Sequence, residues 1–362
     1  MRNRRIVWTV AAIAAVLVLT GGGIALALAS RSDSPGAGPD AGRPTPAVTS
    51  ASPSPPPGAD ITGPLDLLLI GVDTRSSIPD WEPHADAIML LHVDEDLRKG
   101  YLTSLPRDLR VDMPRFPKAE FRGGRYKITE AMSRGSRVPG SKRPDTEQGY
   151  ELLTKVISDY TGIDSFDAGA VLTFTGMSRL TDALGGITMR IDQKVLSQHR
   201  RPDGTLRTLR PGGGGYLGPQ ATYRPGTRKL NGWQALDYAR QRYTAGGDYS
   251  RQRHQRQLVK ALLAKAESNG LDTDRDKLQK ILGTLRELLV YSGERSPVEF
   301  AYALRNLGPE NLTMVGLPGD SVTGRGGYLG EELQPVGRQY LRAVAHNQAA
   351  AFLAEHPELV HK

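Results

Sequence analysis

Arginines are concentrated in one short part of the chain, and their spacing indicates what they could bind. The segment Tyr238–Gln257, YARQRYTAGGDYSRQRHQRQ, holds five arginines, one aspartate and one histidine around a Gly-Gly pair. If its first part is extended, the two-residue period of a strand places Arg240 and Arg242 on one face. Two neighbouring guanidinium groups repel each other unless an anion lies between them, and their planar forks suit phosphate. We therefore expect both arginines on a strand beside a polyanion pocket, with a bare basic surface as the alternative.

The second part of the segment predicts a helix that starts at Asp248 and runs to about residue 266. Aspartate is a favoured N-cap residue, which is the simple role for Asp248, and a role in a site is possible in addition. Leu258 and Leu262 define an apolar stripe, and turns of 3.6 residues place Gln255 and then Arg251 on the same stripe. We expect Arg251 and Gln255 to face the protein interior.

Other polar residues of this helix lie off the apolar stripe. Arg253, Arg256 and Lys260 fall on a different face, for which exposure to solvent is expected. His254 lies at the border of the stripe and fits either environment. The arginine cluster is therefore expected to divide into an inward half and an outward half.

Charged residues also follow two apolar runs of strand length. Asp73 and Arg75 come directly after residues 64–72, and Arg107 and Asp108 come directly after residues 100–106. In open α/β sheets, ligands bind beyond the carboxyl ends of the strands, so the two pairs are expected at one crevice. Ordinary termination of the strands would also explain them.

These side chains together suit the chemistry of phosphate. Arginines and Lys127 offer positive charge, and the sequence shows no obvious Ser-His-Asp set or histidine cluster for a metal. Carboxylates such as Asp73 and Asp86 suit a hard cation such as Mg²⁺ that bridges to a bound phosphate. Pyrophosphate chemistry depends mostly on positioning and on neutralising charge, which these groups can supply.

The elements that would position these residues alternate between strand and helix. Near-continuous apolar runs are typical of strands that are buried on both faces. The pattern predicts a three-layer α-β-α sandwich with a central mixed sheet. Strands are expected at residues 64–72, 86–93, 100–106, 168–174, 186–191 and 311–317, and helices at 146–162, 175–186, 273–291, 297–307 and 333–356.

The N-terminal part of the chain indicates where the protein is placed. Residues 6–29 form an uncharged run of 24 residues behind three arginines within residues 1–5. This length suffices for a transmembrane helix, with residues 1–5 cytoplasmic and the body outside the cell membrane; a cleaved signal peptide is the alternative. The Pro-, Ser- and Gly-rich residues 30–60 are expected to be a disordered tether.

Composition narrows the class of partner. The formal net charge is +8, which favours nucleic acid, anionic lipid or a phosphorylated glycan as a partner, and an exported body makes nucleic acid unexpected. The chain contains no cysteine, so disulfides, thiolate catalysis and thiolate metal sites are excluded.

Several motifs occur in an order that resembles a known family. LLLIGVDTR, ADAIMLLHVD, SLPRDLRVDMP, KITEAM, LTDALGG, LNGWQALDYARQRY and GDYSRQRHQRQ follow one another between Leu65 and Ala266. The chain resembles the LytR-CpsA-Psr family of membrane-anchored cell-wall enzymes, in an actinobacterial form. The resemblance implies a catalytic domain over residues 61–320, followed by a C-terminal extension over residues 321–362 with one probable helix.

The resemblance also implies an activity and a set of site residues. The activity is transfer of a wall glycopolymer, teichoic-acid-like or another phosphate-linked glycan, from a polyprenyl-pyrophosphate carrier to peptidoglycan. The lipid tail is expected in an apolar tunnel between the sheet and the helices. By motif position, Arg107, Arg240, Arg242 and Asp86 are catalytic, Arg75, Lys127, Asp248, Arg251 and Gln255 bind pyrophosphate, and Asp73 and Asp86 hold Mg²⁺ or Mn²⁺.

Some positions depart from the family pattern, and some alternatives stay open. His84 stands where many members have arginine, Thr129 replaces asparagine, and His254 replaces a second helix arginine. Residues 201–226 form a Gly-rich, basic insert that is either a floppy excursion or a contact for glycan. Either Asp86 or Asp108 could be the general base. The rival functions are a lipid-pyrophosphate pyrophosphatase and a non-catalytic module that binds wall polymer or lipid carrier.

Overall fold

The computed structural model describes residues 57–73, 80–271, 275–285 and 288–361. The predicted anchor at residues 6–29, most of the predicted tether and Arg75 lie outside these ranges. Within them, no helix combines the length and apolar character needed to cross a bilayer.

A central sheet of seven strands forms the middle of the molecule, in the order β13-β6-β1-β2-β3-β14-β17. Strand β1 pairs antiparallel with β2 and parallel with β6, and β3 pairs antiparallel with β2 and parallel with β14. The predicted mixed sheet is therefore confirmed. Its strands are β1 (Leu65–Asp73), β2 (His84–Val93), β3 (Gly100–Leu105), β6 (Ala168–Thr173), β13 (Leu289–Gly293), β14 (Leu312–Gly316) and β17 (Val360–His361).

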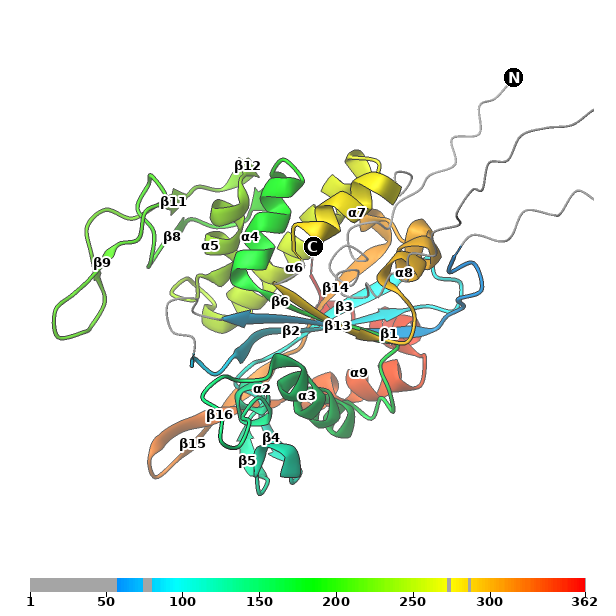
Figure 1. The fold of residues 1–362 in the computed structure, drawn as a ribbon, viewed down its shortest axis with the longest axis horizontal. Helices are drawn as coiled ribbons and strands as arrows, with labels where there is room; N and C mark the ends of the chain where they lie inside the picture. Colours follow the sequence, from blue (N-terminus) through cyan, green and yellow to red (C-terminus); the bar gives the residue numbers. More distant parts are fainter. Residues whose placement is uncertain (1–56, 74–79, 272–274, 286–287, 362) are drawn as a thin grey trace, which may run out of the picture.

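The apolar runs are continuous because both faces of the sheet are covered. In β1, Leu67 and Leu69 pack into one hydrophobic cluster, whereas Leu68 and Ile70 pack into the cluster on the opposite face. Figure 1 shows helices on both sides of the sheet. One side carries α4 (Phe174–Ala183), α5 (Gly232–Arg240), α6 (Gly247–Ser268), α7 (Arg275–Gly283) and α8 (Pro297–Ala303); the other carries α2 (Thr129–Gly135), α3 (Thr146–Thr161), α9 (Pro335–Ala345) and α10 (Ala349–Glu355).

Short two-stranded sheets decorate this core, and several of them border the candidate site. Strand β7 (Ile187–Ile191), predicted as a strand, pairs with β12 (Gly226–Leu230) and stays outside the central sheet. The other pairs are β4 (Arg110–Met113) with β5 (Gly124–Lys127), β8 (Val195–Leu196) with β11 (Thr222–Tyr223), β9 (Thr208–Leu209) with β10 (Tyr216–Leu217), and β15 (Gly319–Gly324) with β16 (Gly327–Leu333).

Two predicted helices differ from the structure. Residues 273–291 were expected to be one helix, but α7 ends at Gly283 and residues 289–293 form the edge strand β13, where Val290 and Tyr291 suit a strand. Residues 333–356 were expected to be one helix, but the chain breaks between α9 and α10. Asn347 has a φ of 58° there, a left-handed conformation that ends a helix.

Candidate functional site

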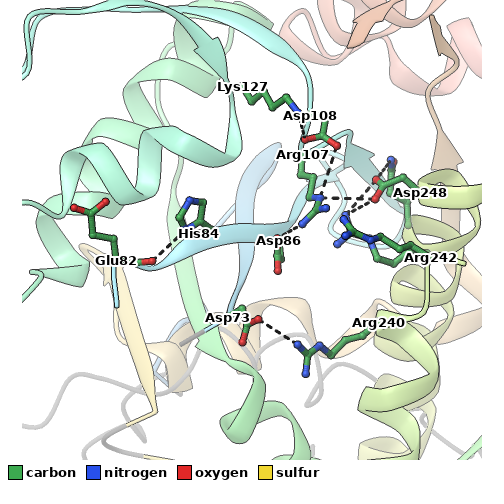
Figure 2. A network of polar contacts seen from close by, with 12 residues as sticks. Asp73, Glu82, His84, Asp86, Arg107, Asp108, Lys127, Arg240, Arg242 and Asp248 are labelled. Atoms are coloured by element: carbon green, nitrogen blue, oxygen red, sulfur yellow. Dashed lines mark hydrogen bonds and ion pairs between the residues drawn. The ribbon is translucent and has the colours of Figure 1, made fainter. Parts of the chain in front are cut away.

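The topology of the sheet brings the predicted site residues to one end. Strands β1 and β3 both run antiparallel to β2, so the carboxyl ends of β1 and β3 meet the start of β2. Asp73 ends β1, Asp86 lies near the start of β2, and Arg107 follows β3. Figure 2 shows these side chains together with Arg240 from α5 and Asp248 from α6. Asp73 and Arg107, one residue of each predicted pair, therefore lie at the same end of the sheet as expected; Arg75 lies outside the described residues.

A cavity of about 900 Å³ opens at this end of the sheet. Its size lies within the range of ordinary ligand-binding clefts. Six of the predicted site residues line it: Asp73, Asp86, Arg107, Arg240, Arg242 and Arg251.

Two ion pairs join the carboxylates to the guanidinium groups. Arg107 Nη1 lies 2.5 Å from Asp86 Oδ1, and Arg240 Nη2 lies 3.2 Å from Asp73 Oδ2. Burial by itself lowers the pKa of Arg107, but the nearby carboxylates, Asp86 foremost and then Asp248 and Asp108, outweigh it and raise that pKa. Arg107 therefore keeps its positive charge in the cavity.

Buried guanidinium nitrogens near the cavity have unused hydrogen-bonding capacity. Arg251 is only 4% exposed and its Nη2 lies 2.8 Å from Asp248 Oδ1. Burial lowers the pKa of Arg251, partly offset by Asp248. Yet the Nε atoms of Arg107 and Arg251 find no hydrogen-bond partner in the part of the chain that the structure describes. A buried donor left unpaired typically costs about 1–3 kcal/mol, so protein partners alone leave these two guanidinium groups incompletely satisfied.

Arg240 and Arg242 are not on a strand, contrary to the expectation. Arg240 is the last residue of α5, which begins with a capping box of Asn231 and Gln234. Helix α5 ends there because the Gln241 side chain donates to the Asp237 carboxylate and backbone, both at 2.9 Å, and the Gln241 backbone becomes extended. Arg240 and Arg242 reach the cavity from a helix end and from the loop that follows.

Asp248 also differs from its predicted role as N-cap. The cap of α6 is Gly246, whose φ of 84° is readily adopted by glycine, and Asp248 lies in the first turn. There its carboxylate accepts from Gln252 at 3.2 Å, pairs with Arg251 and lies 3.8 Å from Arg107 Nε. Asp248 therefore belongs to the network of the site.

The expectation that Arg256 is exposed is wrong. Helix α6 packs between the central sheet and β7, so it is covered on more than one face. Arg256 is 2% exposed, and burial lowers its pKa to about 9. Arg251 and Gln255 face inward as predicted, and Arg253 and Lys260 are half-buried.

His254 and Arg253 hold α6 against β7 through a single carboxylate. His254 is fully buried, stacks on Tyr238 at 4.3 Å, and its Nε2 lies 3.1 Å from Asp192 Oδ1. Arg253 Nε donates to Asp192 Oδ2 at 2.6 Å. Burial raises the pKa of Asp192, but the bonds from His254 and Arg253 outweigh burial and hold that pKa well below its usual value.

Replacing Asp192 by asparagine is therefore expected to destabilise the fold by roughly 1–3 kcal/mol at pH 7. Because the folded-state pKa is depressed, the stabilisation is complete above the unfolded pKa of about 3.9 and is lost as the pH falls through the folded value. The difference in unfolding free energy should shrink below about pH 4, measured by denaturant titration. Asp112→Asn at an exposed position is the control. Equal stability of wild type and Asp192→Asn at pH 7 would contradict this role.

Lys127, Asp108 and His84 lie around the cavity rather than in its lining. Lys127 Nζ lies 3.1 Å from Asp108 Oδ1 and 4.5 Å from the Tyr328 ring, on the other side of Arg107 from Asp86 (Figure 2). His84 Nδ1 lies 3.1 Å from the carbonyl oxygen of Glu82.

An apolar pocket adjoins the charged cavity. Its position could not be predicted from the pattern of residues in the sequence. It lies between the sheet and helices α4, α5 and α6, and Phe174 and Arg240 line both spaces. The ring of Phe174 also lies under the Arg240 guanidinium, at 4.2 Å. Gly71 and Ala87 line the pocket side by side, and a Cβ on Gly71 would come within 3.0 Å of the Ala87 side chain. Gln255 lines this pocket together with Leu69, Met89, Leu172, Met177, Leu236, Leu258 and Val259.

Several known proteins are similar to this chain in sequence or in fold. Biofilm regulatory protein A of Streptococcus mutans is 30% identical over 207 residues, which are 56% of this chain and 44% of that protein. Cell wall biosynthesis protein LcpA of Corynebacterium glutamicum is 27% identical over 289 residues, 74% of this chain and 52% of that protein. The solved structure of TagT bound to LIIa-WTA has a TM-score of 0.56 at 21% identity and covers 81% of this chain and 92% of its own.

The fold and the site define an α/β domain whose main cavity joins a carboxylate pair to several guanidinium groups. A model of the LytR_cpsA_psr family matches residues 39–333, so the chain belongs to that family. The resemblance drawn from the motifs is thereby confirmed. The chain spans about half the length of these two curated relatives.

Proposed function

We propose that this protein transfers a wall glycopolymer from a polyprenyl-pyrophosphate carrier to peptidoglycan on the outer side of the cell membrane, to which residues 6–29 anchor it. The observation that carries the proposal is the cavity that Arg107, Arg240, Arg242 and Arg251 line together with the carboxylates of Asp73 and Asp86. A pyrophosphate brings the negative charge and the acceptor oxygens that these donors lack.

The adjoining apolar pocket marks where the lipid of a lipid-linked substrate would begin. Its volume is about 50 Å³, so a polyprenyl chain that continues past Phe174 and Arg240, which border both spaces, requires the pocket to widen. The names of the relatives point in two directions, since LcpA is called a cell wall biosynthesis protein and the Streptococcus mutans relative a regulatory protein. The charged cavity suits a transferase and equally a module that only binds the donor, so turnover is the property that separates the two.

The donor set fits a divalent cation such as Mg²⁺. Asp73 and Asp86 both line the cavity, and magnesium commonly takes one or two protein carboxylates and completes its shell with water and substrate phosphate. Among the described residues there is no group of three or more histidines and carboxylates that would form a closed metal site. We propose that Asp73 and Asp86 hold Mg²⁺ or Mn²⁺, which when bound would neutralise charge on the pyrophosphate oxygens.

The chain's own residues then have separate tasks. Arg107, Arg240 and Arg251 hold the pyrophosphate and neutralise its charge while an acceptor hydroxyl attacks the phosphorus that carries the glycan. The bond from that phosphorus to the bridging oxygen breaks, and polyprenyl phosphate leaves. The hydroxyl proton goes to Asp86 or Asp108. Asp86 lines the cavity but pairs with Arg107 and is assigned to the cation, whereas Asp108 pairs with Lys127 outside the lining.

An assay with full-length protein, a polyprenyl-pyrophosphate glycan and peptidoglycan tests the proposal. We expect phosphate-linked glycan on peptidoglycan only when Mg²⁺ or Mn²⁺ is present, with loss of transfer on adding a chelator. Release of free glycan phosphate regardless of acceptor would instead indicate a pyrophosphatase. Binding of the donor without turnover would indicate a regulatory module, and either result would refute the proposal.

A further inference from the structure

The insert of the sequence is an ordered wall that encloses one side of the cavity. This insert wall, residues 195–223, contains the strand pairs β8/β11 and β9/β10 and projects at the far left of Figure 1. A single side chain ties it together: the Arg207 guanidinium donates to the carbonyl oxygens of Gln198, Tyr216 and Gly218 at 2.7, 2.9 and 3.0 Å. Most of the hydrogen-bond donors of Arg207 therefore stabilise the conformation of the insert wall.

A buried carboxylate fixes the insert wall to α5. Asp237 is 6% exposed and accepts from Ser197 Oγ at 3.0 Å and from the Tyr223 hydroxyl at 2.8 Å, near the two ends of the wall. The same carboxylate accepts from Gln241, at the end of α5. The wall and the helix that carries Arg240 are thus held in one relative position.

The cavity continues from the charged end along α5 to the insert wall. Trp233, Leu236 and Arg240 all line it, and their spacing of three and four residues places them on one helix face. Seven residues separate Trp233 from Arg240, which is about 10 Å along a helix at 1.5 Å per residue. A pyrophosphate held by Arg240 cannot also fill the space at Trp233, so this extension suits the part of the donor attached to the pyrophosphate.

The part of the cavity between Arg240 and the insert wall is lined by aromatic rings and by groups that can form hydrogen bonds. His199 and Tyr216 of the wall meet edge to face at 5.1 Å, and both line the cavity with Arg200 and Gln198. Burial, reinforced by Arg240, lowers the pKa of His199, so its ring is neutral at neutral pH. Apolar ring faces beside hydrogen-bonding groups suit a sugar, which has apolar C–H faces and a rim of hydroxyl groups.

Gly204 closes the wall onto Trp233. It has a φ of +86°, and a Cβ at this position would come within 2.8 Å of the indole ring. Only glycine fits this turn against the ring, so the turn holds Trp233 in place while leaving the indole half-exposed.

We propose that the insert wall and Trp233 form a saccharide subsite for the sugars that directly follow the pyrophosphate of the donor. This inference rests on the proposed function, because it takes the pyrophosphate at Arg240 as its starting point. The donor glycan is favoured over the acceptor glycan, because the subsite continues from Arg240 along the same face of α5.

Binding of two probes to the full-length protein tests the subsite. One probe is an isoprenoid pyrophosphate without sugar, and the other is the same pyrophosphate carrying a hexose disaccharide. We expect the wild-type protein to bind the sugar-bearing probe about tenfold more tightly, equivalent to about 1.4 kcal/mol. Tyr216→Leu, which removes one aromatic face, should reduce this ratio to about twofold while the affinity for the bare probe stays unchanged.

The neighbouring residue supplies a matched control. Leu217 is exposed, lies on the same short strand as Tyr216 and, by the two-residue period, points to the other side. Leu217→Ala should keep the tenfold ratio, and unchanged binding of the bare probe shows that each variant is folded. Trp233→Leu is the second variant, and its preference for the sugar-bearing probe over the bare probe should also fall.

Four results would overturn the inference, and they can be told apart. Equal affinity of the wild-type protein for both probes, or a full tenfold gain in Tyr216→Leu, would remove the saccharide subsite and leave the pyrophosphate site intact. Failure of the wild-type protein to bind either probe would refute the proposed function itself. The fourth result is that soluble peptidoglycan fragments displace only the disaccharide part of the bound probe from the insert wall, while its pyrophosphate stays in the charged cavity. That result would assign the insert wall to the acceptor.

Discussion

Replacing Arg107 by alanine is expected to lower the rate of glycopolymer transfer by about 10²–10³-fold, the usual loss when one donor to developing charge is removed. Arg107 is central to the network: it bonds to Asp86 at 2.5 Å, lies 3.8 Å from Asp248 and 3.9 Å from Asp108, and keeps an unused Nε donor. No other described arginine contacts three of these carboxylates. The measurement is transfer by the full-length variant at saturating Mg²⁺.

Two further variants separate loss of the site from loss of the fold. Arg107→Lys keeps the charge but not the planar fork, and should recover only part of the activity. Arg125→Ala removes an exposed pair with Glu332 and should be close to wild type, because exposed ion pairs contribute roughly 0–1 kcal/mol. Transfer by Arg107→Ala within about threefold of the wild-type rate would show that the pyrophosphate is not held here.

Asp86→Asn is expected to raise the concentration of Mg²⁺ needed for half-maximal transfer by about 10–100-fold or more, since even substitutions next to metal ligands cost that much in affinity. Asparagine keeps the shape of the side chain but lacks the negative charge that a hard cation prefers. It also weakens the bond to Arg107, so the maximal rate should fall as well. The measurement is the rate of transfer across a Mg²⁺ titration.

The same titration on two other variants completes this prediction. Asp73→Asn should shift the Mg²⁺ requirement in the same direction, because Asp73 is the other carboxylate that lines the cavity. Asp112→Asn on the exposed surface should leave the titration unchanged. An Asp86→Asn protein with the wild-type Mg²⁺ requirement would rule out Asp86 as a ligand of the cation.

Much of the framework of the site could be predicted from the sequence. Apolar runs marked β1, β2 and β3, and the charged residues beside these runs marked the end of the sheet where the cavity lies. Helical periodicity was enough to predict that Arg251 faces inward, because two leucines that the core must bury fix the register of the helix. These features depend on local pattern and burial, which sequence records directly.

The geometry of the arginines at the end of α5 could not be predicted in this way. The pattern Arg-Gln-Arg fits a strand by its two-residue period, and it fits equally the last turn of a helix and the loop after it. The helix end is set by contacts of Gln241 with Asp237, four residues before it, and with Gln198, 43 residues before it, and the second contact is too distant in sequence to predict. Arg256 was misplaced for a similar reason, because periodicity reveals one buried face and α6 is covered on several.

The ordered structure of the insert wall could not be predicted from the sequence, for a different physical reason. A glycine-rich, basic segment has no hydrophobic period, so pattern alone leaves both a loose loop and a binding surface open. Its order comes from Arg207 bonding to backbone carbonyl oxygens and from the buried Asp237 that ties it to α5. Polar contacts of this kind leave no periodic trace in the sequence.

A crystal structure of the full-length protein with a polyprenyl pyrophosphate and Mg²⁺ would test the central claim most directly. We expect the pyrophosphate in the charged cavity, accepting hydrogen bonds from the guanidinium groups of Arg107 and Arg251, with the cation held by Asp73 and Asp86. The polyprenyl chain should enter the apolar pocket past Phe174. A pyrophosphate bound elsewhere, or in the cavity without contact to Arg107 and Arg251, would contradict the account.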